Sequence, residues 1–287
     1  MPDTKPDPAT GTLFVVSTPI GNLEDISLRA IRVLREADVV AAEDTRHTAM
    51  LLQHYGISRP ATSLHEHNEG RKAPALVDRL RAGAKIALVT DAGTPSVSDP
   101  GYRLVRAAVD AGLRVEAIPG ASAVLAALVS SGLPTDSFVF AGFPPPKAAA
   151  RDAWLEALRD ERRTVVIFEA PHRILQTLGA GLRVLGDRQV AVGRELTKLH
   201  EEVVRGSLSS VLGRLAPPRG EYTVVVAGAS RASANEPEQV EDHQLLTEFS
   251  LLTDNGKTRR EAIREVAERH GIRAREVFSA LERARRS

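Results

Sequence analysis

Residues 85–101 read KIALVTDAGTPSVSDPG, an apolar run followed by a loop of small, polar and Gly/Pro residues. The run Lys85–Thr90 is short and bounded by turn-forming residues, which predicts a strand buried on both faces. The loop Asp91–Gly101 then leaves the carboxyl end of that strand. The same pattern predicts three further strands, at Thr12–Ser17, Asp38–Ala42 and Arg114–Ile118.

Segments with helical spacing of apolar residues separate these strands, at Leu28–Ala37, Arg46–Tyr55, Ala73–Ala82, Arg103–Ala111 and Ser122–Ser131. Buried strands that alternate with helices are typical of βαβ units, which form a mostly parallel sheet covered on both faces. The fold class predicted for this part of the chain is therefore α/β.

A second alternating block follows a break at Gly132–Asp136. It opens with a strand at Ser137–Ala141 and the sequence Gly-Phe-Pro-Pro-Pro-Lys, whose three prolines predict a stiff connector or an ordered loop. Helices are then predicted at Arg151–Arg162, Arg173–Leu185 and Leu208–Leu215, and strands at Thr164–Phe168, Gln189–Gly193 and Tyr222–Ala227. The block indicates a second α/β domain.

The C-terminal residues have a different character. Residues 229–239 are small and polar, which predicts a linker, and helices are expected at Leu245–Thr253, Arg259–His270 and Ala274–Arg285. The last two flank a glycine turn in a helix-turn-helix-like pattern. The expected division is a disordered lead (1–11), two α/β domains (12–133 and 134–228), the linker, and a small helical domain (240–287).

Composition excludes several kinds of chemistry. The 287 residues contain no Cys, which excludes disulfides, zinc-thiolate sites and cysteine nucleophiles. No run approaches the ~20 apolar residues of a membrane helix, so we expect a cytoplasmic protein. The formal charge is +1, but residues 257–287 hold ten Lys/Arg and five Asp/Glu, a net +5 that leaves −4 for residues 1–256.

The loops at the predicted strand ends point to a ligand pocket. Ser17–Leu23, Glu43–Arg46, Asp91–Gly101 and Pro119–Ser122 all follow strands, and ligands of open α/β sheets bind beyond the carboxyl ends of the strands. No G-x-G-x-x-G follows the first strand, and Gly256-Lys257-Thr258 lacks the rest of a phosphate-binding loop. His65-Glu66-His67 lacks zinc-site spacing and is interpreted as a polar loop.

Long stretches also resemble a known family. They are VVSTPIGNLEDISLRA (15–30), AAEDTRHTAMLL (41–52), LVTDAGTPSVSDPGYRLV (88–105), PGASAVLAALVSSGLPTDSFVFAGFPPPK (119–147), FEAPHRI (168–174) and GRELTKLHEEVVRGSL (193–208). They are similar to the ribosomal RNA small-subunit methyltransferase I family of the tetrapyrrole-methylase superfamily. The resemblance covers about residues 12–228 and implies 2′-O-methylation of a cytidine ribose in the decoding region of 16S rRNA. It also implies two α/β domains of tetrapyrrole-methylase type, S-adenosylmethionine as cofactor and a homodimer.

The same resemblance implies a donor site in the cleft between the two domains. Its residues would be Pro19, Gly93, Thr94, Val97, Ser122, Ala123, Phe168, Leu196 and Tyr222. Methyl transfer from a sulfonium needs in-line positioning of the two reactants and no metal.

The acceptor hydroxyl is a poor nucleophile, so a nearby base should help to remove its proton. We expect Glu43 or Asp44 to orient or deprotonate it, although an ion pair of Asp44 with Arg46, buried in the fold, would explain that loop equally well. Contacts with RNA phosphates are expected from the cations Arg46, Arg173, Lys198, Lys257, Arg259, Arg260 and Arg275.

Two alternatives stay open. A tetrapyrrole-ring methylase shares the superfamily, but those enzymes open with a different first loop and lack the basic tail. A DNA-binding regulator with a ligand-sensing body would also combine an α/β body with a helix-turn-helix-like tail. The tail itself could instead be a solvated hairpin, because Glu261, Glu265 and Glu268 alternate with arginines at salt-bridge spacing.

Overall fold

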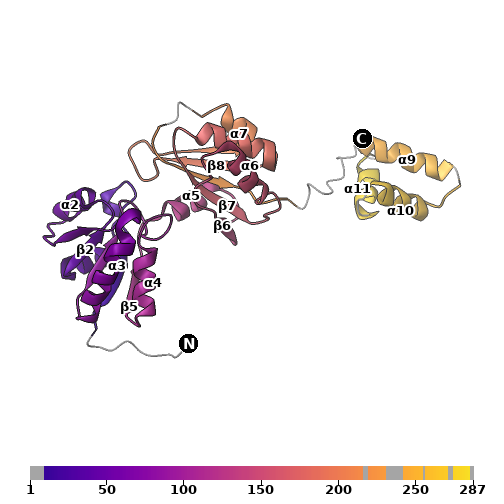
Figure 1. The fold of residues 1–287 in the computed structure, drawn as a ribbon. Coiled ribbons are helices and arrows are strands. Elements are labelled where there is room, and N and C mark those ends of the chain that lie inside the picture. The colour runs from indigo at the N-terminus through magenta and orange to yellow at the C-terminus, as the bar shows by residue number, and fades with distance from the viewer. Residues whose placement is uncertain (1–9, 216–218, 231–241, 255, 271–273, 285–287) are drawn as a thin grey trace. The chain divides into compact units, whose positions relative to one another are not determined.

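The structure is a computed structural model that describes residues 10–215, 219–230, 242–254, 256–270 and 274–284. The chain divides into two compact units, Met1–Gly228 and Ala229–Ser287, and Figure 1 shows the elements of each. The lead expected at 1–11 and the linker expected at 229–239 lie largely outside the described residues. In the part that the structure describes, no helix combines the length and apolarity needed to cross a membrane.

The first lobe is a parallel sheet with the strand order β3-β2-β4-β1-β5. Its strands are β1 (Thr12–Val16), β2 (Val39–Ala42), β3 (Ala61–Ser63), β4 (Ile86–Val89) and β5 (Arg114–Ile118). Its helices are the short 3₁₀ helix Leu23–Asp25, α1 (Leu28–Glu36), α2 (Thr45–His54), α3 (Glu66–Arg81) and α4 (Tyr102–Asp110).

Alternate residues of each strand face opposite sides of this sheet. Ile86 and Leu88 of β4 pack with α3 and α4, whereas Ala87 and Val89 pack with α1 and α2. This two-residue alternation explains why the strands read as continuous apolar runs, since both faces are buried. The parallel, doubly covered sheet predicted for this lobe is confirmed.

The neighbouring strands β1 and β4 form the switch point of the sheet. The chain leaves β1 toward α1 on one face and leaves β4 toward α4 on the other face. Their following loops therefore diverge and open a crevice at the carboxyl edge, which is where ligands bind in open α/β sheets.

The second lobe is a mixed sheet with the order β6-β7-β10-β8-β9, in which only β6 and β7 run parallel. Its strands are β6 (Phe138–Phe140), β7 (Thr164–Glu169), β8 (Gln189–Arg194), β9 (Glu202–Ser207) and β10 (Tyr222–Val226). Its helices are α6 (Ala148–Glu156), α7 (Ile174–Leu185) and α8 (Leu208–Leu212), which pack with one face of the sheet.

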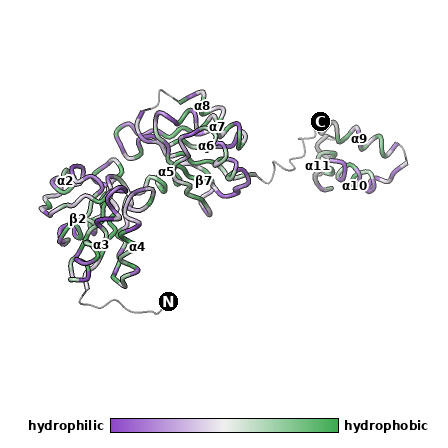
Figure 2. Tube along the Cα trace, in the orientation of Figure 1, coloured by the Kyte–Doolittle hydropathy of each residue, from purple (hydrophilic) through white to green (hydrophobic). Residues whose placement is uncertain are grey.

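The helix α5 (Ala123–Ser131) covers the other face of the second sheet. Val124, Ala127 and Leu128 pack with Val166 and Val225, although α5 directly follows the first sheet in the chain. Figure 1 shows α5 between the two sheets, and Figure 2 shows the strands as largely hydrophobic segments. The helix therefore joins the two lobes through an apolar core.

Three local expectations were wrong or incomplete. The segment His65-Glu66-His67 is not a loop, because α3 begins at Glu66, and the Asn68 side chain accepts a hydrogen bond from His65 N at 3.0 Å. The sequence predicts that this helix starts only at Ala73. That start is too late, because Pro74 lies inside α3 and a proline disfavours helical backbone at the residue before it. The edge strands β3 and β9 were missed, since their short segments become strands only by pairing with β2 and β8.

The second unit contains α9 (Asp242–Asp254), α10 (Arg259–His270) and α11 (Ala274–Ala284). Leu245, Leu252, Val266 and Val277 contribute to its own apolar core. The α/β class with two sheets and C-terminal helices, as expected, is confirmed.

Candidate functional site

Two loops meet at the switch point of the first sheet. Thr18 follows β1 and Gly93 follows β4, and they pair as an isolated bridge, with Thr18 N donating to Gly93 O at 2.9 Å and Gly93 N donating to Thr18 O at 3.1 Å. The side chains of Ser17 and Thr94 are also hydrogen-bonded at 2.8 Å. Gly93 has φ +83°, a conformation that favours glycine. The two loops are thus held together as one rigid edge.

Left-handed backbone marks the loops of both lobes that face each other. Among the described residues, the non-glycine positions with positive φ are Ser96, Ser98, Glu195 and Thr197. Such conformations cost about 1–3 kcal/mol each and cluster at ligand sites. Gly21 completes the contact, since a Cβ there would lie 2.4 Å from Cγ of Lys198.

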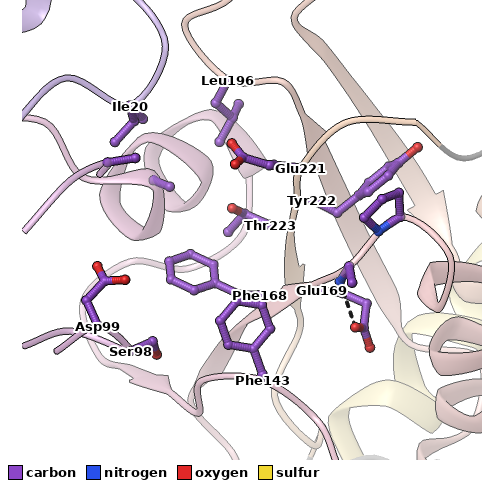
Figure 3. Close-up of a pocket in the computed structure, with 14 residues that line it drawn as sticks. Ile20, Ser98, Asp99, Phe143, Phe168, Glu169, Leu196, Glu221, Tyr222 and Thr223 are labelled. Carbon is purple, nitrogen blue, oxygen red and sulfur yellow. Dashed lines mark hydrogen bonds between the residues drawn. The ribbon is translucent and has the colours of Figure 1, made fainter. Parts of the chain in front are cut away.

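A cavity of about 360 Å³ lies between the two lobes (Figure 3). We call it the inter-lobe cavity; it is lined by Ile20, Ala92, Ser98, Asp99, Ala123, Phe143, Phe168, Glu169, Ala170, Pro171, Leu196, Glu221, Tyr222 and Thr223. The rings of Phe143 and Phe168 are 5.5 Å apart and form an aromatic wall, with Asp99 across from them in Figure 3. Its volume is within the ~300–1,000 Å³ range of small-molecule sites.

The nine residues expected at the donor site divide into three groups. Ala123, Phe168, Leu196 and Tyr222 line the inter-lobe cavity. Gly93, Val97 and Ser122 directly adjoin lining residues in the chain, and Ser122 caps α5 by accepting from Leu125 N; Thr94 is two residues from Ala92 and bonds to Ser17 instead. Pro19 instead lines a second cavity beside α2. Sequence reasoning missed Asp99, Phe143 and Glu221, because the folding of other segments brings them to the site.

The inter-lobe cavity suits an adenosine-containing ligand with a charged end. Aromatic and aliphatic side chains supply faces for a flat ring, and Glu221 supplies a carboxylate. In the loops on either side, Ser96 Oγ and Thr197 Oγ1 are buried and have no hydrogen-bond partner within the described residues. Unpaired buried hydroxyls are costly, which is consistent with a polar ligand that completes their hydrogen bonds.

An acidic pair lies at the edge of the inter-lobe cavity. Glu43 Oε2 accepts a hydrogen bond from Thr90 Oγ1 at 2.7 Å, and the charge of Glu43 interacts with the nearby carboxyl group of Asp99. Burial, and then the negative charge of Glu43, raises the pKa of Asp99 to about 7, while the Thr90 hydroxyl acts the other way. A half-buried carboxyl that titrates near neutrality inside a cavity has the properties of a general base.

The expected catalytic residues Glu43, Asp44 and Arg46 lie at the carboxyl end of β2. Asp44 caps α2 and pairs with Arg46 at 2.6 Å, so the ion pair exists, but the Arg46 side chain is 88% exposed. Hydrogen bonds from the Arg46 side chain and backbone hold the pKa of Asp44 well below its usual range. Asp91 links this edge to α2 by accepting from Asp44 N and contacting His47 Nδ1 at 3.1 Å.

The cations expected to contact RNA from the second lobe are already partnered. Arg173 NH2 pairs with buried Glu169 at 2.6 Å, and its side chain is 16% exposed. Lys198 Nζ lies 3.0 Å from Glu195 and 2.9 Å from Glu221. Burial acts to lower the pKa of Lys198, but hydrogen bonds to these two carboxylates outweigh it and raise the pKa. Both cations stabilise the walls of the inter-lobe cavity, and their contacts with RNA stay predictions.

The cations expected from the tail lie on the surface of the second unit. Arg259, Arg260 and Arg275 are exposed, and Lys257 pairs with Glu265. A hollow in this unit has the Arg259 guanidinium 5.5 Å from the Phe278 ring, and it is lined by Arg259, Arg260, Glu261, Ile263, Arg264, Ala274 and Phe278. An aromatic side chain among arginines is the composition of single-stranded RNA sites.

Comparison with known proteins gives the family. The family model of tetrapyrrole (corrin/porphyrin) methylases matches residues 12–212. A protein from Mesorhizobium japonicum named ribosomal RNA small subunit methyltransferase I is 50% identical over 82% of this chain and 81% of its own length. One of the same name from Synechocystis is 44% identical over 93% of this chain and 96% of its own.

Solved structures agree on the fold. The uroporphyrin-III C-methyltransferase of Thermus thermophilus, complexed with S-adenyl homocysteine, matches 75% of this chain and 97% of its own with a TM-score of 0.53 and 21% identity. At that identity the match concerns the fold alone. Taken with the sequence matches, the chain belongs to the tetrapyrrole methylase family and, within it, to the ribosomal RNA small subunit methyltransferase I proteins.

Proposed function

We propose that this protein transfers the methyl group of S-adenosylmethionine to the ribose 2′-hydroxyl of a cytidine in 16S rRNA of the small ribosomal subunit. Relatives that are 44–50% identical carry the name of a small-subunit rRNA methyltransferase. The single structural observation that supports the proposal is the half-buried Asp99, with a pKa of about 7, in a cavity that suits an adenosine. An enzyme with this substrate works in the cytoplasm, next to ribosomes.

The inter-lobe cavity is the proposed donor site. When bound, S-adenosylmethionine supplies an electrophilic methyl group on a sulfonium. The rings of Phe143 and Phe168 would hold the adenine, and Ala123 leaves room beside them. The remaining residues expected to contact the donor stay part of this proposal. They lie on the first, third and fourth strand-end loops and on the second-lobe wall, and are Pro19, Gly93, Thr94, Val97, Ser122, Leu196 and Tyr222.

Asp99 is the proposed general base. Its carboxylate would accept the proton as the 2′-oxygen forms its bond to the methyl carbon and the carbon–sulfur bond breaks toward sulfur. Glu43 would raise the basicity of Asp99 through its charge. Asp44 fits the role of base less well, because hydrogen bonds from Arg46 lower its pKa and make its carboxylate a weak base. Asp44 and Arg46 would rather orient the RNA at the edge of the site.

Substrate RNA is proposed to contact Arg46 and the tail cations Lys257, Arg259, Arg260 and Arg275. The hollow beside Phe278 and its three arginines supports a role of the second unit in RNA binding. Each phosphate contact adds to the salt dependence of binding. Deletion of residues 240–287 should therefore weaken RNA affinity and flatten its salt dependence; unchanged values for both would contradict this role.

Transfer of labelled methyl groups tests the function. Purified protein with labelled S-adenosylmethionine is offered 30S subunits, duplex DNA or a porphyrinogen, and the 30S RNA is digested to nucleosides. Label in 2′-O-methylcytidine from 30S subunits alone is the expected result. Label in the porphyrinogen would favour a tetrapyrrole methylase instead, and label in none of the three would overturn the methylase proposal. Light scattering of the same sample tests the proposed homodimer.

A further inference from the structure

The protein has a second cavity next to the proposed catalytic edge, entirely within the first lobe. It has a volume of about 310 Å³ and lies between the loop after β1, the helix α2 and the end of β4. We call it the α2 cavity. Of the residues proposed to contact the donor, Pro19 lines it, and Asp99 does not.

The α2 cavity and the inter-lobe cavity are lined by neighbouring residues of the same two loops. In the first loop, Thr18 and Pro19 line the α2 cavity, whereas Ile20 lines the inter-lobe cavity. In the third loop the same change occurs between Asp91 and Ala92. The bridge of Thr18 with Gly93 holds these two loops together. A molecule in the α2 cavity would therefore lie next to the proposed donor site.

The acidic pair lies at the same boundary. Thr90, which lines the α2 cavity, donates to Glu43, and the Thr90 hydroxyl and the Glu43 charge both act on Asp99 in the inter-lobe cavity. A hydroxyl group held at this boundary would have a donor on one side and a base beside it. This is the position that an acceptor needs.

The lining of the α2 cavity combines apolar faces with hydrogen-bonding groups at one end. Pro19, Leu23 and Met50 supply the apolar surface, and Met50 is 61% exposed, which makes it an accessible side chain at the mouth of the cavity. His47 and Asp91 supply the polar end and are paired at 3.1 Å. A flat heterocycle with polar edges fits such a lining, and a volume of this size suits one nucleoside rather than a duplex.

We propose that the α2 cavity receives the base of the acceptor nucleotide, unstacked from its RNA strand, with the ribose directed toward Asp99. The inference rests on the proposed function and adds where the acceptor binds and how it is selected. Single-stranded RNA is read through unstacked bases that contact side-chain planes and hydrogen-bond at their edges. The imidazole of His47 and the thioether of Met50 supply the surfaces for stacking.

Asp91 is the proposed selector for cytosine. A carboxylate accepts a hydrogen bond from the N4 amino group of cytosine, whereas the O4 of uracil is itself an acceptor and would be repelled. Asp91 already accepts from Asp44 N through Oδ1 and contacts His47 through Oδ2, so its position is fixed by two partners. A carboxylate oxygen has lone pairs left for a further donor.

The first test fills the cavity. Met50→Trp should lower kcat/KM for 30S subunits by about tenfold or more, because the ring occupies the proposed place of the acceptor base. The Kd for S-adenosylmethionine should stay within about twofold, since Met50 does not line the inter-lobe cavity. Gln53→Trp places the same ring on α2 at an exposed position that does not line the cavity, and it should match the wild type. Equal kcat/KM for Met50→Trp and Gln53→Trp would overturn the proposal.

The second test changes selection. Asp91→Asn replaces one acceptor oxygen with an amide that can donate to the O4 of uracil. The preference for 30S subunits with cytidine rather than uridine at the target position should fall by about tenfold or more. An unchanged preference would overturn the role of Asp91. If the wild type methylates 30S subunits and both variants behave as the wild type, this inference fails and the proposed function stands; if the wild type transfers no methyl to 30S RNA, the proposed function itself fails.

Discussion

Of the carboxyl groups that line the inter-lobe cavity, Asp99 of the first lobe and Glu169 of the second have opposite surroundings. Glu169 ends β7 and is 2% exposed, yet its oxygens are fully partnered, by Arg173, by Ala170 N at 2.7 Å and by Thr177 Oγ1 at 2.5 Å. Asp99 follows β4, is only half-buried and has a second acid, Glu43, beside it instead of a cation.

The difference separates a structural acid from a reactive one. A buried carboxyl group with a cation and two further donors has its hydrogen bonds met within the fold and holds the loop that follows it. A carboxyl group beside another acid and away from water resists ionisation, so it can take and release a proton near neutral pH. Burial alone therefore does not identify the base, because the more buried acid is the one that holds the fold.

The largest effect should come from removing the charge of the reactive acid. Asp99→Asn keeps the size of the side chain but cannot accept the proton, so kcat for methyl transfer should fall by about 10²–10⁴-fold. Single-turnover transfer to 30S subunits measures it. Because Asp99 lines the proposed donor site, the Kd for S-adenosylmethionine is measured as well, and the transfer is run at saturating donor so that a loss of chemistry is separated from a loss of donor binding. If Asp99→Asn has the kcat of the wild type, Asp99 is not the general base, and the functional difference between Asp99 and Glu169 does not exist.

The structural acid should show the opposite response. Glu169→Ala leaves the poorly exposed Arg173 without its anion and should reduce the free energy of unfolding by about 3–5 kcal/mol. Urea denaturation measures it. Asp110→Ala, which breaks the exposed pair with Arg106, is the matched control and should shift the urea midpoint far less. Equal shifts of the urea midpoint for the two variants would show that the ion pair of Glu169 with Arg173 stabilises the fold no more than the exposed pair does.

The raised pKa of Asp99 should appear in both activity and stability. The base must be ionised, so kcat/KM should rise with pH and level off above a pKa of about 7. The folded state holds a proton between pH 4 and 7 that the unfolded chain has released, since the ordinary pKa is 3.8. Stability from this group is therefore lost as the pH rises through that window.

Asp99→Asn should then be more stable than the wild type at pH 8, by about 1–2 kcal/mol once solvent screening of a half-exposed group is allowed for, and equal to it at pH 3.5. Thermal unfolding at the two pH values measures the gap. A gap of the same size at both pH values would mean that Asp99 titrates in the ordinary range.

The smallest effect is expected at the exposed pair. Asp44→Asn keeps a capping side chain for α2 and loses only the charge that pairs with Arg46 at the surface. The kcat of Asp44→Asn should stay within about threefold of the wild type. Arg46→Gln should keep its kcat within the same range, but its RNA binding should depend less on salt. A large loss of kcat for Asp44→Asn would return the role of base to the residue first expected.

Much of the fold could be predicted because it depends on local pattern. The strand at Arg114–Ile118 and the helix at Arg259–His270 have the predicted boundaries, since each combines clear periodicity with a turn-forming neighbour. The pieces that failed depend on distant partners or on a local exception. β3 and β9 are strands only because β2 and β8 supply hydrogen bonds, and α3 continues through Pro74 against the local preference.

By itself the sequence determined the α/β class, the loops at the strand ends, the family and the basic tail, because these follow from periodicity, composition and long motifs. Only the tertiary structure decided which of the many acids is unusual. The pKa of Asp99 is raised first by burial and then by the charge of Glu43, which lies 56 positions earlier and meets it at the edge of the first sheet. Charge interactions depend on the distance between groups in space, so their effect on a pKa can be predicted only from the folded structure.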